Sequence, residues 1–317
     1  MTLRGYSIDR RATRFLLVAL FLTVPAWAKD LPPYFVKILQ PRTLFAKNEP
    51  VPIIIRLGNQ SERNLKSRKF PPVLESLVVM KGDERLALDP KYKSKDLFRK
   101  LNVLEMGNHK DFRLNIKRLF PAMAEGGVFS IGYKDNIYEH MFKNIQIAKV
   151  DLPPLDAHYV LETSKGDITL KLHHDQAPRH ARNFAVLVAI GFYKNMIWHR
   201  VDKGFVIQTG DPLGTGEGGS NFSLQLETTP FLKNKKYSVG AARGNDRDSA
   251  NSQFYVCLSD VSALDNDYTV FAEVIDGFEA VDAIGNVATT GSKAKPANRP
   301  LEEVALRDVK IKAVEAN

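Results

Sequence analysis

Residues 198–211 read WHRVDKGFVIQTGD, and this stretch decides how the second half of the chain folds. Its Arg200 carries a permanent charge in an apolar neighbourhood. Residues 205–207 are apolar and lead directly to an amide, Gln208. A buried arginine beside amides and aromatic walls can hold a neutral carbonyl without acid or base chemistry. The other interpretation, that Arg200 closes a barrel by pairing with an acid, is equally open from these residues alone.

The elements around this stretch predict a barrel. Residues 159–163 and 167–172 alternate and are separated by a turn, which is typical of a β-hairpin. Pro178 suits the first turn of a helix, and apolar residues from Phe184 onward recur at helical spacing until Gly191. A second helix is predicted around residues 278–284. The intervening chain is strand and loop, which favours a closed β-barrel with two helices over alternating βαβ units.

Four other functional interpretations carry less weight. The glycines of residues 214–219 match the dinucleotide fingerprint GxGxxG, but residues 221–226 alternate as a strand where that site needs a helix, so a surface loop is favoured. No Gly-Lys-Ser/Thr phosphate loop and no Gly-x-Ser-x-Gly elbow is present. Three histidines lie close together in the sequence, but their spacing fits no metal site, so we interpret them as ordinary surface side chains; they are His173, His174 and His180.

The chain has one cysteine, Cys257, in an apolar segment. An intramolecular disulfide is therefore impossible, and a small core residue is a better interpretation than a nucleophile.

The first half has a different pattern. Residues 53–57, 112–116 and 129–133 alternate with a period of two between glycine-containing turns. About seven short strands in roughly 120 residues predict a β-sandwich that resembles the immunoglobulin-like modules of exported bacterial proteins. The pair Pro153-Pro154 marks a boundary near Leu155.

The amino terminus has the three parts of a secretory signal peptide. Four arginines precede a short apolar run, residues 15–24, and the small-x-small ending Ala26-Trp27-Ala28 follows. The run is shorter than the ~20 residues that span a membrane. We expect cleavage after Ala28 and export, with the periplasm as the expected compartment. The predicted domains are therefore 1–28 (signal peptide), 29–152 (β-sandwich) and 156–315 (barrel).

Composition agrees with two globular domains. The 317 residues are 44% hydrophobic and 26% charged, which excludes a wholly disordered chain. Residues 29–155 hold 23 basic and 14 acidic side chains, whereas residues 156–317 hold 18 and 21. The basic residues are scattered among acids, so we expect no nucleic-acid partner, and no second apolar run of spanning length follows the first.

Several linked motifs resemble the cyclophilin family. The stretch at 198–211 is similar to the signature FHRxxxxFxxQGGD, and residues 241–255 resemble the second active-site strand of that family. Residues 264–274 continue in register. The resemblance covers about residues 157–313 and implies an eight-stranded barrel capped by two helices.

The resemblance also implies peptidyl-prolyl cis-trans isomerase activity on proline-containing polypeptides, without cofactor or metal. Arg200 would hydrogen-bond the prolyl nitrogen as the amide twists, with Phe205 and Gln208 as its catalytic neighbours. The alternative is a weakly active binding or chaperone module whose sandwich binds clients or an envelope partner. The implied substrate-binding residues are Val206, Ala242, Arg243, Gln253, Tyr255, Leu264 and Tyr268.

The chain departs from the best-known cyclophilin pattern in four places. Tyr255 replaces a phenylalanine and brings a hydroxyl that needs a partner. Tyr268 replaces a histidine and Thr209 replaces a glycine. Ala263 stands where cyclosporin-sensitive members have a tryptophan, so we predict weak cyclosporin binding.

Overall fold

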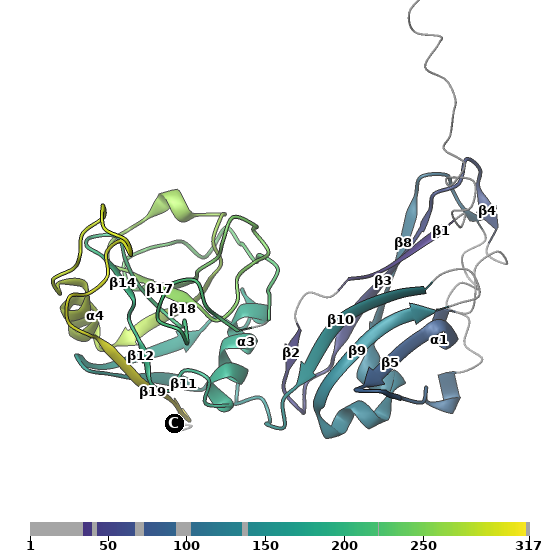
Figure 1. Cartoon of the computed structure of the whole chain (residues 1–317), viewed down its shortest axis with the longest axis horizontal. Coiled ribbons are helices and arrows are strands. Elements are labelled where there is room, and N and C mark those ends of the chain that lie inside the picture. The colour runs from purple at the N-terminus through teal and green to yellow at the C-terminus, as the bar shows by residue number, and fades with distance from the viewer. Residues whose placement is uncertain are drawn as a thin grey trace, which may run out of the picture.

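The computed structural model describes residues 34–39, 43–66, 73–92, 103–134, 139–220 and 222–314. The predicted signal peptide lies outside these residues. The chain is mainly β, and Figure 1 shows its strands gathered in two regions joined by the segment after β10. Among the described helices, none has the length and apolar character needed to cross a membrane.

The amino-terminal region consists of two sheets around one core. Ile53 and Ile55 of one sheet and Phe129 and Ile131 of the other are fully buried in the same cluster, as their alternation predicts. The first sheet has the order β1 (Tyr34–Leu39), β3 (Pro52–Asn59), β8 (His109–Asn115). The second has the order β2 (Leu44–Phe45), β10 (Glu139–Ile147), β9 (Gly127–Lys134), β5 (Leu77–Lys81), β6 (Glu84–Arg85).

Short elements complete this region. Strands β4 (Leu65–Lys66) and β7 (Val103–Leu104) form a separate pair. The helical turns are α1 (Val73–Ser76), η4 (Pro90–Tyr92), α2 (Ile116–Leu119) and η5 (Pro121–Glu125). The immunoglobulin-like class of the region stays a prediction.

The second region is one curled sheet. Its order is β13 (Met196–Ile197), β19 (Ala305–Lys312), β11 (His158–Thr163), β12 (Gly166–Leu172), β18 (Val270–Asp276), β16 (Ser238–Ala241), β17 (Phe254–Cys257), β15 (Val206–Thr209), β14 (Arg200–Asp202). The two edge strands, β13 and β14, are consecutive in the chain and separated only by Trp198 and His199. One chain segment therefore pairs with both ends of the sheet, and the sheet curls round on itself. Among the described residues this sheet has nine strands where eight were expected, because the segment from Met196 to Asp202 is interrupted.

Two helices pack against the curled sheet as the sequence predicts. Helix α3 (Pro178–Ala189) begins at the predicted proline, and α4 (Phe278–Gly285) covers the predicted range 278–284. A turn, η6 (Ser262–Leu264), lies before β18. The prediction of a strand at 221–226 is wrong for residues 222–226, which form only an isolated bridge between Leu224 and Ala250.

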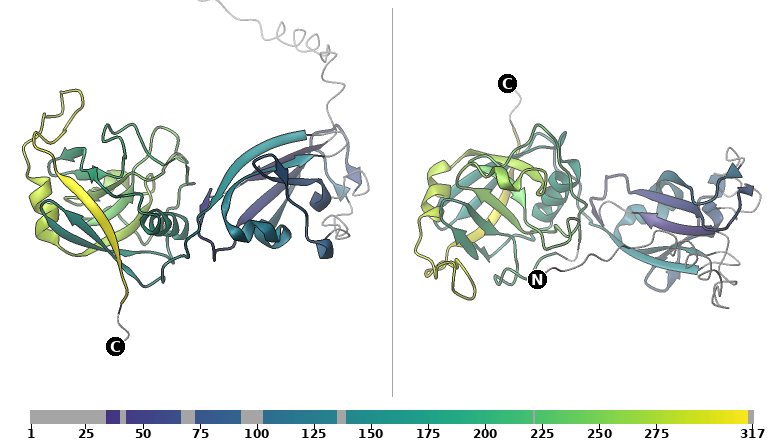
Figure 2. Two further views of the ribbon diagram at one scale, coloured as in Figure 1. Left: turned by 60° about the horizontal axis from the view of Figure 1, so that its bottom comes forward. Right: turned by 90° about the horizontal axis from the view of Figure 1, so that it is seen from above.

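Helix α3 meets the amino-terminal region at β2, and the views of Figures 1 and 2 agree on this contact. Leu44 and Ala46 are fully buried and belong to the core cluster of the curled sheet. The Arg182 guanidinium lies 4.0 Å from the buried carboxylate of Glu49. Asn48 accepts a hydrogen bond from the backbone of the connecting segment at 2.8 Å. The contact is therefore apolar at its centre, with polar groups beside it.

Candidate active site

Strand register brings the quoted arginine and amide together. In the antiparallel pair β14–β15, Arg200 stands opposite Gln208, and in β15–β17 Gln208 stands opposite Tyr255. Residues directly opposite each other in an antiparallel pair project to the same face. Three neighbouring strands therefore present these three side chains side by side on one face.

A chain of hydrogen bonds holds the Arg200 guanidinium. Its Nη2 donates to Asp202 Oδ2 at 2.7 Å and its Nη1 donates to Gln208 Oε1 at 3.2 Å. Gln208 Nε2 donates in turn to Gln253 Oε1 at 2.8 Å. The guanidinium carbon lies 5.9 Å from the centre of the Phe205 ring. Arg200 pairs with an acid, Asp202, as one interpretation of the sequence held, yet its side chain remains 36% exposed and can reach a ligand.

The chain continues into the loop at 211–219. Gln253 Nε2 donates to the carbonyls of Gly216 and Gly218 at 2.9 and 2.6 Å. The fully buried Asp211 carboxylate accepts backbone N–H groups from the same loop, including Gly216 at 2.7 Å and Thr215 at 2.9 Å. Burial alone would raise the pKa of Asp211, but these backbone donors outweigh burial and lower it. The charged carboxylate therefore fixes the loop that orients Gln253.

Beside Arg200 lies a cavity of about 510 Å³. Val206 and Tyr255 are buried in its lining, and Leu264 and Tyr268 pack against them. Burial raises the pKa of the Tyr255 hydroxyl, so this side chain is neutral at physiological pH. The cavity combines an apolar wall with a cationic hydrogen-bond donor at its side.

A second cavity of about 310 Å³ shares part of this lining. Gln208, Ala242 and Arg243 line both cavities, and Gln253 lines the second. The Arg243 guanidinium lies 4.4 Å from the centre of the Tyr268 ring, and its Nε donates to the Asp267 carbonyl at 3.0 Å. Arg243 thus stands between the two cavities and supports the wall of the larger one.

All ten residues that the sequence singled out lie in this place. Nine line the larger cavity and Gln253 lines the smaller one. Sequence reasoning missed Pro296 and Ala297, which border the larger cavity from a distant loop, and it gave no role to Asp211, although the quoted stretch contains it. Their roles toward a substrate stay predictions.

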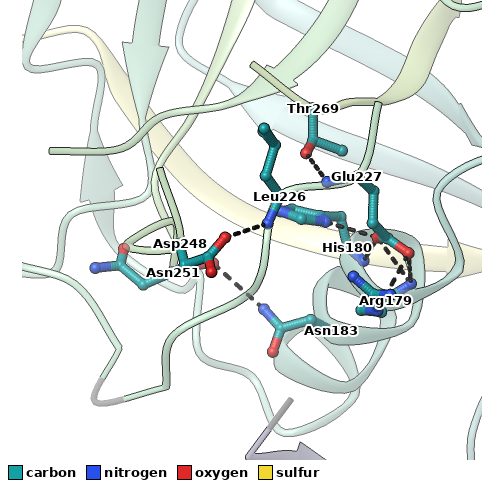
Figure 3. Close-up of polar contacts among 8 residues, drawn as sticks. All are labelled: Arg179, His180, Asn183, Leu226, Glu227, Asp248, Asn251 and Thr269. Atoms are coloured by element: carbon teal, nitrogen blue, oxygen red, sulfur yellow. Dashed lines mark hydrogen bonds and ion pairs between the residues drawn. The ribbon is translucent and has the colours of Figure 1, made fainter. Parts of the chain in front are cut away.

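Glu227 joins the start of helix α3 to Thr269, the residue after Tyr268 of the cavity wall, and Figure 3 shows these contacts of Glu227. Glu227 accepts the backbone N–H groups of Arg179 and His180 at 3.0 Å each, and the His180 Nδ1 at 2.7 Å. The Glu227 N–H donates to Thr269 Oγ1 at 2.9 Å, next to Tyr268. Burial would raise the pKa of Glu227, but its contacts with His180 and the helix N-terminus lower it. Glu227 therefore links the start of α3 to the strand that follows the cavity wall.

Other reactive side chains lie elsewhere. Burial raises the pKa of the Cys257 thiol to about 11, which agrees with a core residue. His173 borders a separate surface cavity, but the expectation of a surface histidine is wrong for His180, which is 2% exposed and buried against Glu227. Within the described ranges, no group of three or more metal-binding side chains comes together.

Comparison with known proteins identifies this part of the chain. The family model described as cyclophilin type peptidyl-prolyl cis-trans isomerase/CLD matches residues 158–314. Peptidyl-prolyl cis-trans isomerase-like 1 of Aspergillus fumigatus is 35% identical over 155 residues, which are 48% of this chain and 93% of that protein. Peptidyl-prolyl cis-trans isomerase-like 3 of Gallus gallus is 35% identical over 156 residues, or 48% and 94%.

A solved cyclophilin type isomerase of Cryptosporidium parvum is 31% identical, has a TM-score of 0.47, and is aligned over 50% of this chain and 99% of its own. The family match and the two relatives that are 35% identical define residues 158–314 as a cyclophilin-type domain. The chain belongs to the cyclophilin-type peptidyl-prolyl isomerase family. Residues before 158 lie outside the family match.

Proposed function

We propose that this chain is an active peptidyl-prolyl cis-trans isomerase that accelerates rotation about X-Pro bonds. The observation that carries the proposal is the Arg200 guanidinium, held by Asp202 and Gln208 at the side of an apolar cavity. Prolyl rotation needs an apolar place for the ring and a donor for the twisting amide, and the cavity offers both.

The reaction follows from amide resonance. Rotation about a peptide bond faces a barrier of ~18–20 kcal/mol because the C–N bond has double-bond character. As the bond twists, resonance is lost and the prolyl nitrogen becomes a hydrogen-bond acceptor. Arg200 then donates to that nitrogen, an interaction stronger in the twisted state than in either planar state, and this difference is what accelerates rotation.

Neighbouring groups position the substrate. Phe205, Leu264 and Tyr268 receive the proline ring in the cavity. Gln208 and the backbone at Ala242 and Arg243 hold the peptide that precedes the proline. The step makes no covalent bond and transfers no proton.

Exchange spectroscopy on an Ala-Pro peptide tests the proposal, with the full chain and its Arg200→Ala variant. We expect fast cis-trans exchange that falls roughly a hundredfold or more in the variant, the usual cost of removing one transition-state donor. Arg307→Ala removes an exposed arginine of β19 that does not line the cavity and serves as the matched control. Exchange at the rate of free peptide, with a folded chain, would instead favour a binding or chaperone module.

We also propose that the chain is exported. The basic start, the apolar run and the sequence Ala26-Trp27-Ala28 support cleavage by a signal peptidase and folding of proline-containing clients in the periplasm. The mass of the chain recovered from its cells tests this: loss of residues 1–28 is expected, and an uncleaved chain contradicts it.

For the amino-terminal region we propose an immunoglobulin-like sandwich that binds clients or an envelope partner. Two sheets around one core support the architecture. Deleting residues 29–152 is expected to spare peptide exchange and weaken client capture, and unchanged capture contradicts the role.

We further propose weak cyclosporin binding, because Ala263 is exposed and does not line the larger cavity. Titration beside a tryptophan-bearing relative tests this, and equal affinity contradicts it.

A further inference from the structure

The floor of the larger cavity is held by a residue that lines neither cavity near Arg200. The Tyr255 hydroxyl donates to Asn234 Oδ1 at 2.7 Å. Asn234 donates through its backbone N–H and its Nδ2 to Asp265 Oδ1, at 2.8 and 3.0 Å. Its carbonyl accepts the Val261 N–H at 2.7 Å. Asn234 is 2% exposed and Tyr255 is 4% exposed, so these bonds are shielded from water.

The orientation of this amide is set by its partners. A carboxylate only accepts hydrogen bonds, so Asp265 requires the Nδ2 side of Asn234. Burial would raise the pKa of Asp265, but the Asn234 donors, with Lys233 nearby, lower it, so the carboxylate is charged. The Oδ1 side of Asn234 therefore faces Tyr255, and the tyrosine hydroxyl must be the donor.

Asn234 connects the floor of the cavity to its wall. Asp265 follows Leu264 directly in the chain, and the Tyr268 N–H donates to the Leu264 carbonyl at 3.1 Å. The Tyr268 ring stands edge-on to Tyr255, with centres 6.0 Å apart. One asparagine thus fixes both the ring below the cavity and the segment that closes its side.

The neighbouring strand leaves room for this arrangement. A Cβ added at Gly240 would lie 2.2 Å from both Cζ and Oη of Tyr255. The tyrosine hydroxyl reaches Asn234 only because glycine occupies this position. Gly240, Tyr255 and Asn234 are therefore matched in shape and hydrogen bonding.

We propose that Asn234, through Asp265, is a positioning residue of the prolyl pocket that holds Tyr255 and the Leu264–Tyr268 wall in the shape that receives the proline ring. This rests on the proposed function, because it assigns the larger cavity to proline. Asn234 touches no reacting atom, and its effect is on binding of the peptide.

The test first replaces the Asn234 amide and then swaps the amide and the carboxylate between positions 234 and 265. Asn234→Asp sets two carboxylates against each other, and we expect the Kd of an Ala-Pro peptide to rise roughly tenfold, as for a buried polar contact that is lost. Exchange at saturating peptide should change less than about twofold. The double variant Asn234→Asp/Asp265→Asn restores a side-chain donor facing a side-chain acceptor but not the acceptor for the backbone N–H of residue 234, so we expect it to recover part of the affinity.

A matched control separates the effect of this site from that of the chemical change itself. Asn286→Asp makes the same chemical change at the exposed end of α4 and should leave the Kd unchanged. A Kd that stays at the wild-type value in Asn234→Asp, or a double variant that does not recover, overturns the proposal.

The readouts also separate this proposal from the proposed function. Binding is measured by shift titration and does not require turnover. If the wild-type chain binds the peptide without accelerating exchange, isomerase activity fails and the Asn234 series still decides the positioning role. If the wild-type chain does not bind the peptide, both proposals are overturned.

Discussion

At the scale of single residues, the site depends on how a few polar groups are held. Arg200 has one carboxylate and one amide as partners, and the amide is fixed through Gln253 to the loop around Asp211. At the buried end of this network, formed by Gln253 and Asp211, losing one member leaves the others without partners, which costs more than the bond itself.

Asp211→Asn tests this network. The amide introduced at position 211 would place an NH2 donor against the backbone N–H groups of the loop, which need an acceptor. We therefore expect a loss of about 2 kcal/mol in the free energy of unfolding. We also expect exchange of the Ala-Pro peptide to fall about tenfold, because Gln253 is no longer held. Denaturant unfolding and exchange spectroscopy measure the two effects. Normal exchange in a destabilised variant would contradict the link to Arg200.

The contribution of Asp211 to the free energy of unfolding depends on pH. Its pKa is lowered in the folded chain, so its stabilisation is complete above the ordinary carboxyl pKa. The contribution is lost as the pH falls through the lowered folded value. The difference between wild type and Asp211→Asn should therefore shrink in acid.

At the scale of elements, periodicity was a good guide where burial is regular. The alternation of Ile53 and Ile55 and the helical spacing after Pro178 predict β3 and α3 because each element buries one face. Residues 222–226 also alternate, yet the Leu226 N–H goes to Asp248 and the Glu227 N–H goes to Thr269, so side chains replace a strand partner.

The candidate site also has a part that the sequence predicts and a part that it does not. Residues close together in the quoted motifs could be predicted, and the structure brings them to one place. Asn234 could not, because it lies outside those motifs, and only the fold brings it to Tyr255 and Asp265. The sequence predicts that the Tyr255 hydroxyl needs a hydrogen-bond partner but does not show which residue it is.

Helix α3 gives the prediction at this scale. No side chain next to α3 caps its N-terminus, and the distant Glu227 accepts its first N–H groups instead. A carboxylate there satisfies unpaired donors and opposes the positive end of the helix dipole. Glu227→Gln keeps the shape and removes the charge, so we expect a loss of about 1–2 kcal/mol in the free energy of unfolding at neutral pH.

Acid should remove the stability difference between Glu227→Gln and wild type. The pKa of Glu227 is lowered by folding, so its contribution is present above the ordinary carboxyl range and disappears as the pH falls through the folded value. Thermal unfolding at neutral and acidic pH measures this. Glu302→Gln, an exposed carboxylate, is the control and should change neither curve. A Glu227→Gln deficit that persists at low pH would contradict the charge-based explanation.

At the scale of the whole molecule, the contact between α3 and β2 determines whether the two regions move together. Leu44 is fully buried in the core cluster of the curled sheet, although it belongs to the other region. The Arg182–Glu49 pair beside it is 4.0 Å long and includes a buried carboxylate, so the cost of removing that carboxylate from water offsets much of the attraction. Apolar burial therefore dominates the contact.

Salt and a single substitution distinguish these contributions. Salt at 1 M screens interactions between charges more than roughly 3 Å apart. It does not weaken apolar burial, and some salts strengthen it. We therefore expect the same small-angle scattering profile at low and high salt. Leu44→Asp places a charge in the apolar contact and should increase the radius of gyration, while each region still unfolds in its own transition. Leu213→Asp alters a leucine that is 72% exposed and serves as the control. A wild-type profile that expands with salt would mean that the ion pair, rather than Leu44, holds the two regions together.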